Sequence, residues 1–251
     1  MVRKQIDINC DVGEGVGNEP SLFPLLSSCN IACGGHAGNQ ESMDAVLQLA
    51  KEHRVKVGGH PSFPDVENFG RKVLPMKPEA LLSSLQRQLE ALCNRCVVAG
   101  VPLYHVKPHG ALYNLAAVDK KTAVVVVDAV LELGNDVKLY APMQSELAKS
   151  AEEAGVAVVK EAFADRRYDA DVQLVSRSHH QALLTRPEAV FAQVLSIYER
   201  QLVQVISGEF KSLHADTYCF HSDTKEVVEV LHYTVAALAN RNVYLAKNDE
   251  V

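Results

Sequence analysis

The chain has 251 residues, of which 25 are Lys or Arg and 31 are Asp or Glu, giving a formal net charge of −6. There is no basic block that could neutralise a phosphate backbone, which argues against a nucleic-acid partner. A chain of this length can bury one large core, so we expect a single domain over 1–251.

Neither a signal peptide nor a membrane span is indicated. The first fifteen residues lack an apolar region of signal-peptide length, and no run of about 18 apolar residues occurs. Six cysteines without a secretion signal indicate reduced thiols. Cys93 and Cys96 have CxxC spacing but lie in an apolar helical run with no second CxxC, which is weak support for zinc or redox chemistry. We expect a soluble, cytoplasmic protein.

Short apolar segments alternate along the chain with longer segments of helical periodicity. Seven strands are expected, at 5–10, 28–33, 55–60, 103–109, 137–142, 156–163 and 216–221. The segment 242–246 could add an eighth, peripheral strand. Helix boundaries between these strands are indicated by N-capping residues, by prolines in a first turn and by a terminal glycine. The boundary residues are Asn39, Pro78, Gly100, Asp119, Gly134, Pro187 and Asp223.

Alternation of strand and helix predicts parallel strands with right-handed crossovers, either in a closed barrel or in an open sheet. Polar side chains at the carboxyl ends of six strands favour the barrel, because a barrel gathers its site at one rim. They are Asn9, Asp11, Asn30, His36, His60, Lys107, His109, Glu161, Asp165, His221 and Asp223. The longest segments without periodicity, 10–27, 60–77 and 162–185, all follow strand ends and are expected over that rim.

The stretch HVKPHGALYN, residues 105–114, ends a predicted strand with cations. His105, Lys107 and His109 are two residues apart, so their side chains are expected on one face. Gly110 allows a sharp turn or a close approach to a ligand. The alternative is structural, with Lys107 in a salt bridge and His109 as a satisfied core histidine.

The stretch GGHPSFPDVENFGRK, residues 58–72, indicates a shaped loop around His60. Arg71 would suit bidentate recognition of a carboxylate, although a surface ion pair is the alternative.

The acidic candidates are Asp7, Asp11 and Glu14 after the first strand, and Glu161, Asp165 and Asp169 after the sixth. Asp7, Asn9 and Asp11 alternate along the first strand and share a face. We expect this face inside the barrel, because Ile6 and Ile8 then point to the helices. Two carboxylates close to the lysine and histidines would form a charged network with displaced pKa values, as acid–base catalysis requires.

The same polar residues bear on metal and nucleotide sites. Histidines and several carboxylates supply enough ligands for zinc or manganese, so a metal stays open, and no residue is assigned as a ligand. The histidines concerned are His36, His60, His109, His214 and His221. Residues 13–17, GEGVG, do not complete GxGxxG, and neither GxxxxGK[ST] nor GxSxG occurs.

Six blocks in order give the chain a specific resemblance. They are DINCDVGEG, NIACGGHAGN, GGHPSFPDVENFGRK, HVKPHGALYN, EAFADRRYDAD and DTYCFHSD. Together they resemble the LamB/YcsF family over essentially the whole chain. Gly35, Asn39 and Asn68 depart from the family pattern, which has CGFHAGD around the first two and GFGRR around the third; Gly59, Lys72 and Ser222 depart as well.

The resemblance implies an irregular seven-stranded (β/α) barrel of the glycoside hydrolase/deacetylase type. It also implies ATP-dependent opening of the lactam of 5-oxo-L-proline to L-glutamate, together with 5-oxoprolinase subunits B and C. Because this chain has no nucleotide motif, the ATP site is expected on the partner subunits. Association of several copies of the chain stays open.

The residue pattern and the resemblance together suggest roles. Lys107 and His109 would stabilise developing negative charge, and Asp11 would activate water. His60 would protonate the departing nitrogen, and Arg71 or Arg166 would hold the substrate carboxylate. The remaining residues expected at the substrate are Asn9, Asn30, His36, Glu161, Asp165 and His221. Two alternatives are a stand-alone metal-dependent amide hydrolase or sugar deacetylase, and a non-catalytic substrate-binding subunit.

Overall fold

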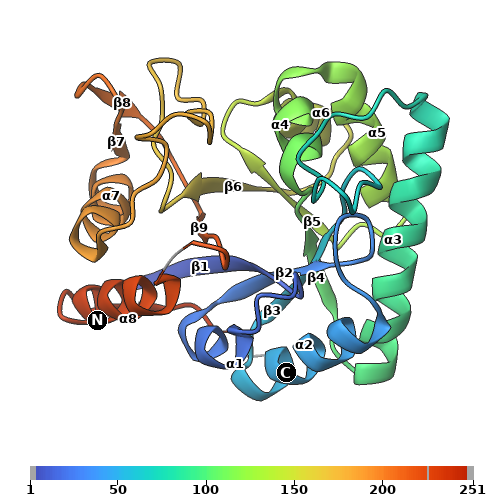
Figure 1. Ribbon diagram of the computed structural model, residues 1–251, viewed down its shortest axis with the longest axis horizontal. Coiled ribbons are helices and arrows are strands. Elements are labelled where there is room, and N and C mark those ends of the chain that lie inside the picture. The colour runs from blue at the N-terminus through green and yellow to red at the C-terminus, as the bar shows by residue number, and fades with distance from the viewer. Residues whose placement is uncertain (1–3, 225, 248–251) are drawn as a thin grey trace.

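A computed structural model describes residues 4–224 and 226–247 (Figure 1). Seven parallel strands form a closed ring in the order β1-β2-β3-β4-β5-β6-β9, and β9 pairs back onto β1. Their bounds are β1 Lys4–Val12, β2 Ser28–Ala32, β3 Lys56–His60, β4 Leu103–Val106, β5 Lys138–Pro142, β6 Val158–Phe163 and β9 Thr217–Phe220. The predicted seven-stranded parallel barrel is confirmed.

One predicted strand is too long at its carboxyl end. β4 stops at Val106, not at residue 109, and the chain leaves the ladder at Pro108, which has no N–H. Lys107 N–H still donates to Gly59 O at 2.9 Å and His109 N–H to Pro61 O at 2.8 Å. The expected peripheral strand exists as β10 (Val243–Leu245), which pairs in parallel with the start of β1.

Helices surround the ring of strands on its outer side (Figure 1). They are α1 Glu19–Leu22, α2 Gln40–His53, α3 Pro78–Ala99, α4 Gly110–Val118, α5 Lys120–Leu131, α6 Glu146–Glu153, α7 Pro187–Arg200 and α8 Val227–Ala239, with a short 3-10 helix η1 at Phe23–Leu25. The apolar core lies between the strands and this outer layer. Within the described residues, no helix is long and apolar enough to cross a bilayer.

The helix boundaries follow the capping residues in the sequence. Asn39 forms a capping box with Ser42 at the start of α2, so asparagine at this departure from the family pattern still performs the capping role. Asp119 accepts a hydrogen bond from the Thr122 N–H at the start of α5. α3 ends at Gly100, whose φ of 66° is the left-handed conformation that glycine adopts without strain.

Several elements of the fold were not predicted, among them the short helices α1 and η1 within the segment 10–27. The helices α4 and α6 were missed, and the residues after α7 form an antiparallel hairpin of β7 (Leu202–Gln204) and β8 (Phe210–Ser212). This hairpin stands apart from the barrel strands, beside α7 (Figure 1).

The inside of the barrel is polar, as the alternation along β1 predicts. Ile6 and Ile8 belong to the apolar core. On the opposite face, Asp7 accepts hydrogen bonds from Ser28 and Thr217, both at 2.7 Å. Asn9 and Asp11 follow on the same face toward the carboxyl end, and both are buried. The strand therefore carries its polar residues up the barrel axis to the rim.

His105 lies in the middle of this interior, and the glycine in the neighbouring strand makes room for it. Its ring stacks on Tyr140 with centroids 3.7 Å apart. A Cβ atom at Gly58 would lie 2.1 Å from His105 Nε2, which is far inside van der Waals contact. Gly58 is thus required by packing, whereas the sequence suggested only loop flexibility before His60.

Candidate active site

A cavity of about 680 Å³ opens at the carboxyl ends of the barrel strands, where (β/α) barrels place their active sites. Its floor and walls come from strand ends, from the start of α4 and from the loop after β6. The lining includes Asp11, Glu14, His60, Arg71, Lys107, His109, Tyr113, Glu161, Phe163, Arg166, Arg177, His221 and Asp223.

Lys107 is the central cation of the floor and is only 2% exposed. Its Nζ donates to Asp11 Oδ1 at 2.9 Å and pairs with Glu161 Oε1 at 3.0 Å. Cys219 Sγ, 3.0 Å away, and Asn9 Oδ1, 3.5 Å away, complete its surroundings. Because sulfur is a weak acceptor, the N–H that points to Cys219 is the one most easily given to a ligand.

The ionisation states in this floor follow from mutual pairing. Burial opposes the charge on Lys107, but Asp11, Cys219 and Glu161 together raise its pKa well above the usual value. Burial likewise opposes ionisation of Asp11, yet His60 and Lys107 hold the pKa of its carboxyl well below the usual value. Tyr113 donates to Glu161 Oε2 at 2.7 Å, and burial beside that carboxylate raises the pKa of its hydroxyl. The floor thus contains an ammonium, a carboxylate and a protonated phenol.

A chain of hydrogen bonds behind the floor fixes these groups. Asn30 Nδ2 donates to Asn9 Oδ1 and to Asp11 Oδ1, both at 2.8 Å. Asn9 Nδ2 donates in turn to Glu161 Oε1 at 3.0 Å, and His105 Nε2 donates to Asn30 Oδ1 at 2.7 Å. Asn9 and Asn30 are fully buried and absent from the cavity lining, so they position Asp11 and Glu161 and do not reach into the cavity.

Three histidines and one carboxylate converge beside Asp11, and we name Glu14, His36, His60 and His109 the His/Glu cluster. Glu14 Oε1 lies 2.9 Å from His36 Nε2, 3.4 Å from His109 Nδ1 and 3.9 Å from His60 Nε2. One ligand atom from each of the four side chains lies within 4.8 Å of the others. His36 stacks on His109 with centroids 3.6 Å apart.

Backbone carbonyls fix the ring protons of two of these histidines. His60 Nδ1 lies 2.7 Å from Lys107 O, and His109 Nε2 lies 2.9 Å from Phe69 O. A carbonyl oxygen only accepts, so each of these nitrogens carries the proton. Burial lowers the pKa of His109, assisted by the neighbouring histidines, and burial also lowers the pKa of His36. In their neutral forms, His60 Nε2 and His109 Nδ1 therefore present lone pairs to each other across 3.0 Å.

The loop after β3 covers the cluster. Phe69 has a φ of 55°, a left-handed conformation that costs a side-chain-bearing residue energy, and its ring packs edge-on against His36 and His109. Gly70 O accepts the Ala111 N–H at 2.9 Å, which ties the loop to the start of α4. The loop conformation thereby supplies the carbonyl that orients His109.

Gly35, a departure from the family pattern, also has a packing reason in this chain. A Cβ atom there would lie 2.3 Å from Gln88 Oε1 and 2.4 Å from Ser62 Oγ. Gln88 is buried and forms reciprocal hydrogen bonds with the Ser62 backbone at 3.0 and 2.9 Å. Gln88 thus occupies the space into which a larger side chain at 35 would extend.

Arginines line the outer part of the cavity. Arg71 pairs with Asp223 at 2.5 Å and is partly exposed, so its carboxylate-binding group has an internal partner in this structure. Arg177 lies 3.6 Å from the same carboxylate. Arg166 is 6% exposed and donates to Val175 O, while its buried Nε has no hydrogen-bond partner among the described residues. Arg166 is thus the arginine best placed to accept an added carboxylate.

Asp165 is buried and holds His221 at the cavity wall. It accepts the His221 backbone N–H at 3.0 Å, the Nδ1–H at 2.9 Å and the Thr224 hydroxyl at 2.8 Å. Burial opposes ionisation of Asp165, but His221 and these hydrogen bonds leave the pKa of its carboxyl below the usual value. Asp165 does not line the cavity, whereas His221 does.

Replacing Asp165 by asparagine should make unfolding less sensitive to acid. Because the folded-state pKa is lowered, ionised Asp165 stabilises the fold above its unfolded pKa of about 4, and this stabilisation is lost as pH falls through the folded value. We expect Asp165→Asn to cost about 1–3 kcal/mol near neutral pH, with the difference from wild type narrowing below about pH 4. Urea unfolding between neutral and acidic pH measures this, and exposed Asp128→Asn is the control. If the difference in unfolding free energy between Asp165→Asn and wild type stayed constant with pH, Asp165 would not stabilise the fold through its ionised form.

Most of the residues expected at the site are brought together. Asp11, His60, Lys107, His109, Arg71, Glu161, Arg166 and His221 line one cavity. Asn9, Asn30, His36 and Asp165 lie directly behind this lining, and His214 is exposed and does not line the cavity. The sequence patterns did not assign Tyr113, Arg177 or Cys219 to the site, and Glu14 was an acidic candidate without an assigned role. For Glu14 a signal existed, since it follows the first strand between two glycines.

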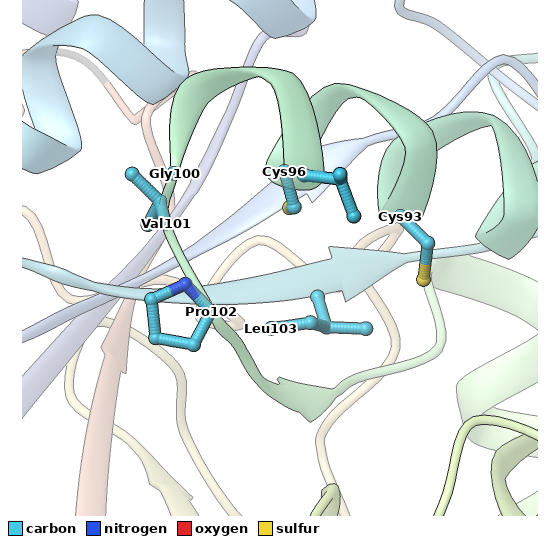
Figure 2. A pocket seen from close by; sticks show the side chains of 7 residues that line it. Cys93, Cys96, Gly100, Val101, Pro102 and Leu103 are labelled. Carbon is cyan, nitrogen blue, oxygen red and sulfur yellow. The ribbon is translucent and has the colours of Figure 1, made fainter.

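An apolar hollow on the outer side of the barrel contains the CxxC pair (Figure 2). Cys93 and Cys96 project from α3 toward Leu103, with Val101 and Pro102 beside them. Both thiols are free, and burial raises the pKa of Cys93 and raises that of Cys96 to about 12. Thiolate chemistry requires the opposite shift, so a packing role accounts for this pair.

Comparison with known proteins places the chain among lactam-metabolising relatives. The model of the LamB/YcsF family matches residues 6–251. A protein of Tolumonas auensis, named as the A subunit of 5-oxoprolinase, is 40% identical over 95% of this chain and 97% of its own length. The crystal structure of a lactam utilization protein from Thermus thermophilus superposes with a TM-score of 0.90 at 35% identity, covering 97% of this chain and 99% of that one. A T48 deacetylase shares the fold alone, with a TM-score of 0.50 at 12% identity over 98% of this chain and 89% of its own.

Proposed function

Because the chain belongs to the LamB/YcsF family, we propose that it is the A subunit of an ATP-dependent 5-oxoprolinase that converts 5-oxo-L-proline to L-glutamate. The observation that carries this proposal is the buried Lys107 paired with Asp11 on the floor of one rim cavity. A cation that stabilises an oxyanion beside a carboxylate that activates water is the arrangement that hydrolysis of an amide needs.

The lactam carbon is a poor electrophile because the ring nitrogen donates into the carbonyl. Transfer of the γ-phosphoryl group of ATP to the amide oxygen removes this resistance. Water then adds to the activated carbon, the C–N bond breaks as nitrogen takes a proton, and the acyl phosphate that is left loses phosphate to a second water. The first water needs a base, and the oxygen substituents need positive charge nearby.

The side chains of the cavity supply these needs in the proposed mechanism. Asp11, which its lowered pKa keeps ionised, accepts the proton of the attacking water. Lys107 stabilises the negative oxygen by exchanging its contact with Cys219 for the substrate. Arg166, whose Nε has no hydrogen-bond partner among the described residues, holds the substrate carboxylate, and Arg71 lies at the outer wall.

The structure limits one suggested role. His60 carries its proton on Nδ1, which is bound to Lys107 O, so it could protonate the leaving nitrogen only with a second proton on Nε2. The buried Tyr113 hydroxyl lines the cavity and is a second candidate donor.

Partner subunits complete the proposal. The chain contains no nucleotide-binding motif of the kinds considered above, so subunits B and C are assigned the binding of ATP and the phosphorylation step. Relatives from Tolumonas auensis and Chloroflexus aggregans are both named as one lettered subunit of 5-oxoprolinase, which supports an assembly of several subunits.

The proposal is tested by measuring glutamate released from 5-oxoproline by this chain with partner subunits B and C. We expect release only when all three subunits and ATP are present. Release by this chain alone without ATP would overturn the proposal and favour a stand-alone amide hydrolase. Undiminished release by the complex after loss of both Asp11 and Lys107 would favour a binding subunit without catalytic residues.

A further inference from the structure

The His/Glu cluster contains an arrangement that needs a cation. His60 Nε2 and His109 Nδ1 lie 3.0 Å apart, and the other nitrogen of each ring donates its N–H to a backbone carbonyl. Two lone pairs at this distance repel each other unless a proton or a metal ion lies between them. In histidine ligands of metal ions, the N–H of the second ring nitrogen characteristically donates a hydrogen bond to a backbone carbonyl or a carboxylate, and both rings here donate to carbonyls.

The distances within the cluster suit a small divalent ion. Two nitrogens bound tetrahedrally to zinc at 2.0–2.1 Å lie about 3.3–3.4 Å apart. The separations from Glu14 Oε1 to the three histidine nitrogens are 2.9, 3.4 and 3.9 Å, around this value. All three histidines are at most 6% exposed, so the ligand atoms are held by packing.

The charges at the floor of the cavity also favour a bound cation. Two carboxylates, those of Asp11 and Glu161, pair with one ammonium, that of Lys107, and a third, that of Glu14, lies among the three histidines. The buried carboxylates of this region therefore outnumber the one ammonium that two of them contact. A divalent cation would balance them, and His60 Nε2 is 3.3 Å from Asp11 Oδ2, next to the cluster.

We propose that the His/Glu cluster is a binding site for a divalent transition-metal ion of the zinc class. Three imidazoles and one carboxylate form a donor set that such ions prefer over magnesium or calcium. His60 and His109 are ready to bind without a change of tautomer. His36 contributes Nε2 once its proton moves to Nδ1, which is buried and has no partner among the described residues. The metal site does not depend on the proposed function; only a role of the ion in turnover rests on it.

The site is tested by titrating the metal-free full-length chain with zinc chloride in a calorimeter. We expect saturation at one ion per chain, and a visible absorption spectrum of four-coordinate geometry when cobalt(II) replaces zinc. Glu14→Gln and His109→Gln should each weaken zinc binding by at least about tenfold. The control is the double variant His179→Ala/His180→Ala, which removes the exposed adjacent histidines and should leave the titration unchanged.

The wild-type titration decides the inference even if a variant fails to fold. Absence of saturable zinc binding by wild-type chain would overturn it, as would loss of binding in the exposed-histidine control with binding retained in the two cluster variants. Glutamate release by the three-subunit enzyme is measured separately. If the three-subunit enzyme turns over but this chain binds no zinc, the metal site is refuted and the proposed function stands. If this chain binds zinc but is inactive with its partners, the proposed function is refuted and the metal site stands.

Discussion

Replacing Lys107 by methionine is expected to abolish glutamate release by the three-subunit enzyme. Methionine keeps most of the side-chain volume but removes the only ammonium among the described groups that contact Asp11 and Glu161. Loss of a preorganised group that stabilises an oxyanion lowers the rate by about 10²- to 10³-fold, and loss of the full charge here should cost at least that much. Single-turnover assays of glutamate formation at saturating substrate measure the effect.

The same substitution must also affect stability, and this has to be separated from catalysis. Removing the cation leaves two carboxylates buried close to each other, a situation that costs about 3–5 kcal/mol unless one of them takes up a proton. The double variant Lys107→Met/Glu161→Gln removes the surplus charge. The glutamine can still accept hydrogen bonds from Tyr113 and Asn9. We expect it to recover much of the lost unfolding free energy but none of the turnover.

The two readouts distinguish a chemical role from a structural one. If the double variant regained both stability and turnover, Lys107 would act only by neutralising the barrel interior. Near-normal turnover of the single variant would remove Lys107 from the mechanism altogether. Urea unfolding of each variant, measured beside its activity, decides between these outcomes.

The barrel could be predicted from sequence because each of its strands is a short apolar run followed by polar residues. The interior of β1 was predictable for the same reason, since Asp7, Asn9 and Asp11 can share a face only inside or outside the ring. The helix α4 was not predictable. Its sequence, GALYNLAAV, begins with glycine, has no side-chain cap and is apolar on nearly every side, so it has no helical face to recognise. The hairpin β7–β8 has strands too short for a pattern.

The candidate site was predictable to the extent that its residues end strands. Lys107, His109 and His60 meet because parallel strands bring their carboxyl ends to one rim. Tyr113 comes instead from the unpredicted helix α4, so nothing in its spacing relates it to the strand residues. Glu14 lies in the loop after β1, where the sequence indicates an acidic candidate but not its contact with three histidines. The ring protons of the histidines depend on carbonyls supplied by loop conformation, above all the left-handed Phe69. Such contacts exist only once the fold has formed.

Asp11→Asn is expected to lower glutamate release by about 10²- to 10⁴-fold, the usual contribution of a general base. Asparagine keeps the shape of the side chain and an oxygen that can accept from Lys107 and Asn30, so the floor should stay ordered. The defect should therefore lie in the rate at saturating 5-oxoproline, with little change in KM. Asp7→Asn is the matched control, because Asp7 lies on the same face of the same strand but pairs with Lys56 at the opposite end of the barrel.

The step at which Asp11→Asn fails tests the proposed order of events. If Asp11 activates the water that attacks the phosphorylated lactam, the variant enzyme should still form ADP in a single turnover while glutamate lags behind. Asp7→Asn should lower the unfolding free energy, and its ADP and glutamate should still form at equal rates. Equal slowing of ADP and glutamate in Asp11→Asn would place this carboxylate before or at phosphoryl transfer and remove it as the base for water. The division of labour between this barrel and its partner subunits depends on that result, because a barrel that acts after phosphorylation must receive an activated substrate made elsewhere in the complex.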